Sequence, residues 1–186
     1  MSGSRAEDAR ARARSYELLA LASSLPSPEL AEAVSNSEAP FASPPLDLKA
    51  LIPEYHRLFV GPGPLPAPPY ESVYREGWRV MGETTREAER QYAAAGYTLD
   101  PSLAELPDHA AAELVFMAVL CEEEATAWEA EDVSAALAWL EREKAFLRDH
   151  LVQWIPAFCD GLVTSTEAPD AERVKALTGL LQEALA

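Results

Sequence analysis

The stretch from Glu54 to Tyr74 constrains the fold of this chain more than any other part of the sequence. It starts as the end of a helix and then becomes too rich in proline and glycine to continue as a helix or as a central strand. It nevertheless keeps Leu65, Tyr70, Val73 and Tyr74, which a flexible linker would not need. A long, stiff and partly apolar connection inside a compact domain is typically well packed or functional.

Two helices are predicted at the start of the chain. Ser4 and Glu7 have the spacing of a capping box, which predicts a helix that continues to about Ser24. Ser27 then stands before a proline in the way that a capping residue precedes a first helical turn, and this predicts a short helix over residues 28–34.

A third helix leads into the connection. The small, polar and proline-broken residues 35–45 predict a surface loop, and Asp47 is suited to cap the helix that follows it. Pro53 should kink this helix or start its second half. Its apolar residues have full amphipathic spacing and are Leu48, Leu51, Ile52, Tyr55, Leu58 and Phe59.

Helical signals resume after the connection. Thr84 and Glu87 form a second potential capping box for a helix through Ala95, with Gly96 as its left-handed stop. Pro107 and Asp108 suit the first turn of a further helix.

This further helix is apolar nearly all round, because Glu113 is the only charged residue between Ala110 and Cys121. Such a helix belongs at the centre of a bundle. We expect it to reach solvent at Glu122–Glu124, which we interpret as a solvated acidic face rather than as catalytic carboxylates.

The remainder of the chain predicts two or three more helices. Asp132 or Ser134 caps the first, Pro156 stands where another could begin, and Ala168–Asp170 opens the last. Their inner faces are predicted from apolar spacing to contain Val133, Leu137, Leu140, Leu147, Leu151, Trp154, Ile155, Phe158, Leu162, Val174, Leu177, Leu180 and Leu181, with Phe146 close by.

These patterns predict an all-α fold, a single helical-bundle domain with a long proline-rich connection in its middle. No apolar alternation is long enough for a sheet, and no internal repeat is present. A length of 186 residues suits one domain, and 48% hydrophobic with 25% charged residues is ordinary globular usage. We expect N-terminal helices over 1–59, the connection over 60–82 and C-terminal helices over 83–186.

The net charge of the chain limits the classes of molecule that it can bind. A formal net charge of −16 argues against nucleic-acid binding, because each phosphate contact needs a cation. The same field would attract a basic peptide, although it is equally consistent with a role in solubility alone.

Several features predict a cytoplasmic protein without membrane insertion. Cys121 and Cys159 each lie in an apolar run, so we expect buried, inert thiols rather than disulfides or a zinc site. The N-terminus has no apolar signal region, the chain has no Arg-Arg pair, and no apolar stretch approaches the ~20 residues of a membrane span.

Candidate chemistry is sparse. Gly61–Gly63 lacks the lysine and the preceding strand of a phosphate loop, and the three histidines do not have metal-ligand spacing, so we expect no metal site. Asp108 and His109 place a carboxylate beside a titratable ring at the start of a buried helix. A helix cap is the favoured interpretation of this pair, and a charge-sensitive contact on a binding surface is the alternative.

The middle of the chain is rich in aromatic residues, namely Tyr55, Tyr70, Tyr74, Trp78 and Tyr92. Those in the irregular segment cannot all be buried by a helical stripe. A stiff, half-exposed aromatic surface suits recognition of an apolar or basic peptide.

Several motifs occur together in a fixed order. They are Glu54–Pro62, Leu65–Tyr74, Met81–Gly82 with Thr84–Thr85, Pro107–His109 with Glu113–Met117, and finally Phe146–Leu147, His150–Leu151, Trp154, Pro156 and Phe158–Cys159. In order and spacing this set resembles the TorD/DmsD/NarJ family of molybdoenzyme-specific chaperones, also called redox enzyme maturation proteins. The resemblance covers residues from about Glu54 to Leu162.

The resemblance implies an all-helical cytoplasmic chaperone rather than an enzyme. Such a protein binds the twin-arginine leader and the apo form of a molybdopterin oxidoreductase of the DMSO/TMAO reductase type, assists cofactor insertion and delays export. It implies no cofactor, apart from weak guanine-nucleotide binding associated with some members. Carried over position by position, the peptide-binding candidates are Tyr55, Leu58, Phe59, Gly61, Pro62, Pro69, Tyr70, Ser72, Tyr74, Pro107, Asp108 and His109.

Two departures from the family pattern stand out. The family often shows Glu-Pro-x-Asp-His, whereas residues 105–109 here are Glu-Leu-Pro-Asp-His, so Asp108 and His109 match better than Glu105 and Pro107. Tyr70 stands where some relatives carry tryptophan.

Other interpretations stay open at this point. The chain could be a small helical adaptor that binds another protein through the same surface, or a nucleotide hydrolase built on Asp108 and His109. We expect a monomer, and the long connection could also act as a hinge for a domain-swapped dimer.

Overall fold

The computed structural model describes residues 2–36, 45–100, 105–166 and 171–184. In these ranges the regular structure is helical, and the only extended pairing is an isolated antiparallel bridge between Tyr70 and His109. The prediction of an all-α fold is therefore confirmed.

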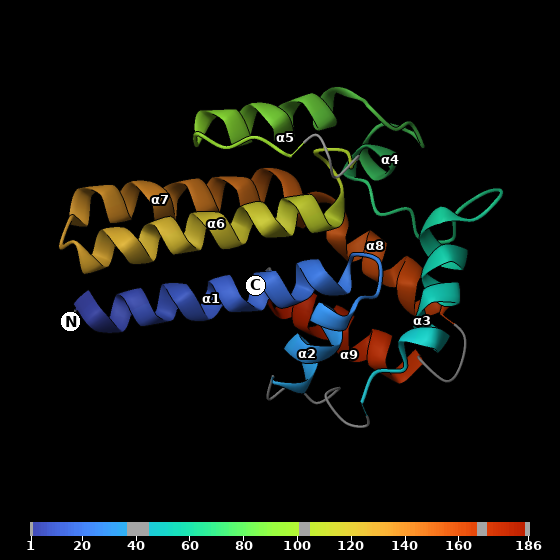
Figure 1. Cartoon of the computed structure of the whole chain (residues 1–186). Helices are drawn as coiled ribbons and strands as arrows, with labels where there is room; N and C mark the ends of the chain where they lie inside the picture. Colours follow the sequence, from blue (N-terminus) through green and yellow to red (C-terminus); the bar gives the residue numbers. More distant parts are fainter. Residues whose placement is uncertain (1, 37–44, 101–104, 167–170, 185–186) are drawn as a thin grey trace.

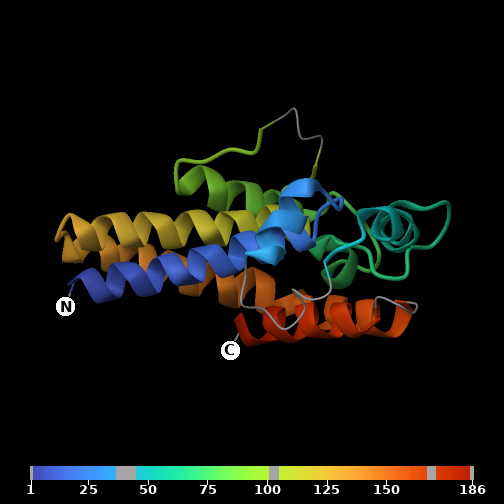
Figure 2. The ribbon, with the colours of Figure 1, turned by 60° about the horizontal axis from the view of Figure 1, so that its bottom comes forward.

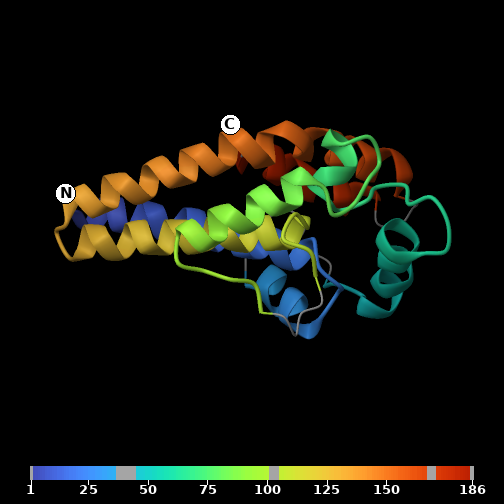
Figure 3. The same cartoon turned by 90° about the horizontal axis from the view of Figure 1, so that it is seen from above.

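The helices are arranged as a long bundle with a second cluster at one end. The helices are α1 (Ser2–Ala22), α2 (Pro28–Ser35), α3 (Leu48–Tyr55), α4 (Glu71–Arg75), α5 (Glu83–Ala94), α6 (Ala110–Glu129), α7 (Val133–Phe146), α8 (Val152–Ser165) and α9 (Ala171–Ala184), with π-helical turns η1 (His56–Val60) and η3 (Leu147–Leu151). Figure 1 shows α1, α6 and α7 side by side, and α2, α3, α8 and α9 gathered at the end away from the N-terminus. Figure 2 shows α9 on the side of the molecule opposite to α5. Figure 3 shows α5 lying over α6 and α7.

Helix α6 is the centre of the bundle, as its sequence predicts. Leu114, Leu120 and Cys121 are fully buried, and burial of a side chain the size of leucine stabilises a fold by about 1.5–3 kcal/mol. The buried part of the helix extends past the position where we expected it to reach solvent. Glu124 is also buried and pairs with Arg12 of α1. The expectation that Glu124 belongs to a solvated face was wrong, since α1 covers it.

Local capping chemistry was predicted correctly at three helix starts. Ser27 accepts a hydrogen bond from the Leu30 amide at 3.3 Å, Asp47 from Lys49 at 3.0 Å and Asp132 from Ala135 at 2.9 Å. These side chains satisfy amides that have no partner within the helix.

Two predicted capping boxes are absent. Ser4 lies inside α1, which already begins at Ser2. At α5 the cap comes from outside the helix, because Glu76 accepts from the Glu83 amide at 3.0 Å and the Thr84 amide at 2.7 Å. The end of α5 agrees with the prediction, since Gly96 has a left-handed φ of +88°.

The third helix differs from its prediction in burial. It begins at Leu48 and passes through Pro53 before it becomes the π turn η1, so Pro53 does not start a second half. No residue of α3 itself is buried, and Ile52 is exposed. The predicted stripe therefore packs only partly, with Leu58 as its buried member.

Helices α7 and α8 follow each other through η3 without a break. Val133 and Leu137 were predicted on the inner face but are about half exposed, at 48% and 49%, whereas Ala136, Glu143 and Phe146 form the buried face. Pro156 lies inside α8 rather than at the start of a helix. Most of the predicted loop over residues 35–45 and the predicted helix start at Ala168–Asp170 lie outside the described residues.

The structure also bears on the predictions about the two cysteines and about membrane-spanning helices. Cys121 and Cys159 are free, buried thiols, and burial raises the pKa of each, with Cys159 at about 12. Among the described residues, no helix has the length and apolar character needed to cross a membrane.

The cap of α5 predicts the effect of a side chain at Gly82. A Cβ atom there would lie 2.0 Å from the Glu76 carboxylate and displace it, so Gly82→Ala should lower the free energy of unfolding by about 1 kcal/mol, the usual value of a helix cap. Urea denaturation measures this change. Gly179→Ala is the control: it meets no atom within 4 Å in α9 and should stabilise the protein by about 0.5–1 kcal/mol. Equal effects of the two substitutions would contradict the cap.

Candidate functional site

The proline-rich connection meets the start of α6 in a short antiparallel contact. The Glu71 amide donates to the Asp108 carbonyl at 2.9 Å, and the Ala110 amide donates to the Pro69 carbonyl at 2.9 Å. The Asp108 carboxylate accepts the Ser72 amide at 3.0 Å. Two segments that are far apart in sequence are thereby fixed against each other.

Asp108 lies before α6 rather than in its first turn, because the helix begins at Ala110. Its side chain is fully buried, and its carboxylate accepts a hydrogen bond from the backbone of α4. The prediction that Asp108 lies in the first turn of this helix was therefore wrong, because its carboxylate bonds to the Ser72 amide of α4 and the capping role falls to His109.

His109 is the capping residue of α6. Its Nδ1 atom accepts the Ala111 amide at 3.1 Å, and its ring stands edge-on to Tyr70 with centroids 5.2 Å apart. Burial lowers the pKa of His109, which favours the neutral ring that this bond requires. The Tyr70 hydroxyl donates to Glu105 at 3.2 Å, and burial together with that carboxylate raises the pKa of Tyr70 to about 12.

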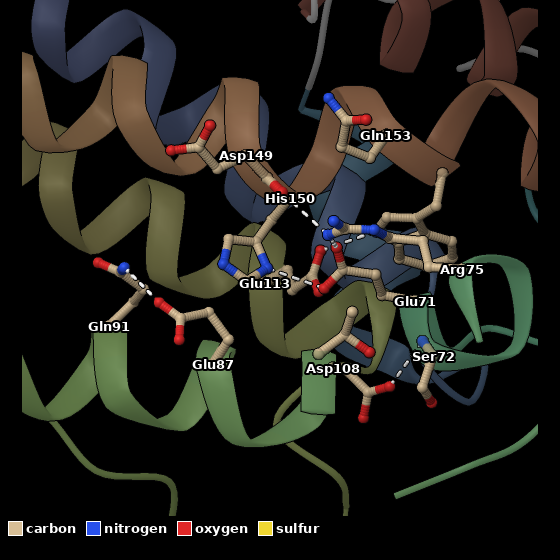
Figure 4. A network of polar contacts seen from close by, with 12 residues as sticks. Glu71, Ser72, Arg75, Glu87, Gln91, Asp108, Glu113, Asp149, His150 and Gln153 are labelled. Carbon is tan, nitrogen blue, oxygen red and sulfur yellow. Dashed lines mark hydrogen bonds and ion pairs between the residues drawn. The ribbon is translucent and has the colours of Figure 1, made fainter. Parts of the chain in front are cut away.

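A buried polar network lies beneath this contact (Figure 4). Glu71 is fully buried; one of its oxygens is paired with Arg75 and the other lies 2.8 Å from His150 Nδ1. Arg75 also donates to the Asp149 carbonyl at 3.0 Å. The network thus joins α4 to the π turn η3.

Glu113 completes the network from the centre of α6. Trp154 Nε1 donates to its Oε2 at 3.0 Å, whereas Oε1 is buried and accepts no hydrogen bond from an N–H or O–H group of the other described residues. Burial, together with the neighbouring Glu71 carboxylate, raises the pKa of Glu113 well above its usual range. A neutral Glu113 can share its proton with the Glu71 carboxylate. Two ionised carboxylates in contact would instead repel each other at a high energetic cost.

The network also has the donor set of a metal site. Glu71, Glu113 and His150 each offer a ligand atom, and these atoms lie within 4.8 Å of one another. Both oxygens of Glu71 are already engaged by Arg75 and His150, and a cation would have to displace these contacts. The arrangement therefore fits a shared proton better than a metal ion.

A second feature is an apolar pocket of about 120 Å³ at the end of the bundle. It lies between α1, α2, α3, η1, α8 and α9, and Tyr55, Leu58 and Phe59 all line it. Tyr55 and Phe59 stack edge-on at 4.8 Å, and Phe59 lies 6.1 Å from Phe158, a further lining residue. This volume suits one large apolar side chain, since a cavity of roughly 150 Å³ holds benzene.

The predicted site residues therefore fall into two groups. Tyr55, Leu58 and Phe59 line the pocket, while those at the contact with α6 are Pro69, Tyr70, Ser72, Pro107, Asp108 and His109. Tyr74 links the groups, because its ring lies 5.5 Å from Trp154 and 6.5 Å from Phe158. Gly61 ends η1 by donating to His56 at 2.6 Å, and Pro62 next to it is exposed.

Sequence reasoning missed Glu71, Arg75 and His150. A signal existed only for Glu113, the single charge in an apolar helix, because such a charge needs a buried partner. His150 enters the interior through a π turn, which has no local sequence signature. Of the predicted aromatic surface, Tyr92 is buried in the core, whereas Trp78 is exposed.

Comparison with known proteins identifies the family. The sequence profile described as nitrate reductase delta subunit matches residues 18–160. The chain belongs to this family. The match confirms the family resemblance drawn from the motifs.

Named relatives and a solved structure agree with this assignment. Chaperone protein TorD from strains of Vibrio cholerae serotype O1 is 29% identical over 92 residues, which is 50% of this chain and 40% of the relative. A crystal structure assigned to a redox enzyme maturation protein from Archaeoglobus fulgidus matches with a TM-score of 0.64 and 23% identity, covering 91% of this chain and 93% of that one. At this identity the structural match concerns the fold alone.

The buried proton predicts a pH dependence of stability. The pKa of Glu113 is higher in the folded state than its ordinary value of 4.5, so the folded protein binds this proton more tightly than the unfolded chain. The stabilisation is complete below pH 4.5 and is lost as pH rises, by up to about 1.4 kcal/mol per pH unit. Glu113→Gln keeps a neutral side chain and should gain stability relative to wild type as pH rises.

Urea denaturation of both proteins between pH 4.5 and pH 8 measures the difference. Burial raises the pKa of Glu143 to about 7. Its titration contributes equally to the stability of wild type and of Glu113→Gln, so it cancels in the difference between them. Glu89→Gln on the exposed face of α5 is the control and should parallel wild type. A pH profile of Glu113→Gln that also parallels wild type would rule out the shared proton.

Proposed function

We propose that this protein is a maturation chaperone for a molybdopterin-dependent oxidoreductase. It binds the twin-arginine leader and the apo form of an enzyme of the DMSO/TMAO reductase type, assists cofactor insertion and delays export. Membership of the nitrate reductase delta subunit family supports this proposal, and the named relatives are chaperones rather than enzymes.

The observation that carries the proposal is the apolar pocket. Three of the residues that the family motifs single out, Tyr55, Leu58 and Phe59, line one pocket with room for a large apolar side chain. Leader peptides of this kind contain an apolar stretch after their arginines. An apolar anchor in a concave pocket is the usual source of affinity in such recognition.

The contact between the connection and α6 is linked to the pocket through Tyr74, whose ring lies 6.5 Å from that of the lining residue Phe158. Pro69 and Ser72 are buried and held by backbone bonds, so the segment that carries Tyr70 and Tyr74 is fixed before any peptide binds. A fixed binding surface loses less conformational entropy on association.

The interpretation as a nucleotide hydrolase has less support. Asp108 and His109 are buried and their side chains bond to backbone amides, whereas a catalytic pair needs access to its substrate. Guanine-nucleotide binding stays a prediction from the resemblance, and a GTP turnover assay with and without leader peptide tests it.

The pocket predicts which substitutions weaken leader binding. Phe59→Ala removes an aromatic wall of the pocket and should raise the Kd for a twin-arginine leader peptide at least about tenfold, the range of a binding hot spot. Isothermal titration calorimetry measures the affinity, and circular dichroism checks that the helices persist.

Val60→Ala is the matched control, because Val60 belongs to the same π turn but is 56% exposed and does not line the pocket. Its Kd should equal that of wild type. Unchanged affinity in Phe59→Ala would exclude the pocket from leader binding.

A pull-down from the native cell extract separates the chaperone from a helical adaptor. A molybdoenzyme precursor as the dominant partner supports the chaperone, and any other dominant partner supports the adaptor.

A further inference from the structure

An acidic cavity lies apart from the apolar pocket. It has a volume of about 600 Å³, opens to solvent between α5 and the turn η3, and shares no lining residue with the apolar pocket. Four carboxylates line it, from Glu76, Glu83, Glu87 and Asp149. The one guanidinium in its wall, that of Arg75, is already bound to Glu71 and to the Asp149 carbonyl.

His150 places a buried imidazole ring in the wall of this cavity. Its side chain is 2% exposed, and Nδ1 is engaged by the Glu71 carboxylate at 2.8 Å. The other ring nitrogen, Nε2, takes no part in that contact. Figure 4 shows this second nitrogen on the side of the ring that faces Glu87 and Gln91, and it has no hydrogen-bond partner among the described residues. A buried ring nitrogen without a partner among the described residues therefore faces a cavity lined by carboxylates.

An exposed apolar loop adjoins the cavity. Trp78, Val80 and Met81 are 73%, 52% and 66% exposed, and the loop that carries them connects the lining residues Glu76 and Glu83. Trp78 and Met81 have φ angles of 66° and 62°, a conformation that disfavours large side chains.

Hydrogen bonds hold this loop in its strained form. The Trp78 amide donates to the Val73 carbonyl at 2.9 Å, and the Glu76 carboxylate binds the first amides of α5. Large apolar side chains kept in water at an energetic cost mark a surface for binding.

We propose that this cavity binds arginine side chains of a partner peptide in which apolar residues follow the arginines. A guanidinium offers several N–H donors in a plane, which suits the carboxylates that line the cavity. The apolar residues then pack on Trp78, Val80 and Met81. The ion pairs that Glu83, Glu87 and Asp149 make with Arg86, Arg90 and Arg148 are solvent-exposed and contribute little, so an incoming arginine can replace them.

The proposal rests on the proposed function for the identity of the peptide, the leader of a client enzyme. It adds a second binding site, for the charged part of that leader, at a surface outside the peptide-binding residues carried over from the family.

Fluorescence anisotropy with two labelled synthetic peptides tests the inference. One contains two adjacent arginines followed by an apolar stretch, and the other has alanines in place of the arginines. The double variant Glu87→Gln/Asp149→Asn should bind the arginine peptide about tenfold more weakly than wild type, in keeping with the loss of charge-assisted hydrogen bonds. It should bind the alanine peptide as wild type does. The control Glu89→Gln removes a charge from the same helix outside the cavity and should bind both peptides as wild type.

The outcomes separate this inference from the proposed function. If Phe59→Ala loses affinity while the double variant binds the arginine peptide normally, the leader still binds and the inference about the cavity is wrong. If wild type binds neither peptide, the proposed function itself fails. Thermal denaturation checks that the double variant folds, which we expect because the Glu87 and Asp149 side chains are 41% and 55% exposed.

Discussion

The hydrogen bond between the Asp108 carboxylate and the Ser72 amide is the interaction on which the rest of the structure depends. Oδ2 of this buried carboxylate accepts the Ser72 amide at 3.0 Å, whereas Oδ1 is buried and has no hydrogen-bond partner among the described residues. A hydrogen bond typically contributes about 0.5–1.5 kcal/mol to stability. With the backbone bonds beside it, this contact converts a proline-rich connection into a fixed part of the fold. It is the side-chain bond among the contacts that attach α4 to the start of α6.

The position of α4 then organises both binding surfaces. Tyr74 contacts Phe158 in the wall of the apolar pocket, whereas the next residue, Arg75, lines the acidic cavity. Glu71 at the start of the same helix enters the buried network with Glu113 and His150. One short helix therefore links an apolar and a charged recognition surface, while α1, α6 and α7 form the rigid body that carries them (Figure 1).

Local chemistry explains why much of the fold could be predicted. The caps at Ser27, Asp47 and Asp132 and the stop at Gly96 depend on neighbouring residues, and the apolar run of α6 allows no other place than the core. Two contacts that failed prediction join elements that the local pattern does not connect. Glu76 caps α5 across a loop, and α1 covers Glu124.

The candidate site could likewise be predicted only in part from the sequence. Family motifs identify residues of the apolar pocket and of the contact with α6, since these residues lie in the motifs themselves. The motifs include Glu71 and His150 but do not show that these two residues pair, because that contact depends on a π turn and on tertiary packing. The acidic cavity has no sequence signal, because its carboxylates come from two segments that only folding brings together.

Hydrogen exchange measured by mass spectrometry, with and without a twin-arginine leader peptide, tests the central claim most directly. That claim is that the leader binds at the end of the molecule organised by α4. The account predicts slower exchange in residues 48–60, 71–94 and 147–158, and unchanged exchange in the distant halves of α1, α6 and α7. Protection confined to those distant halves, or no protection at all, would contradict it.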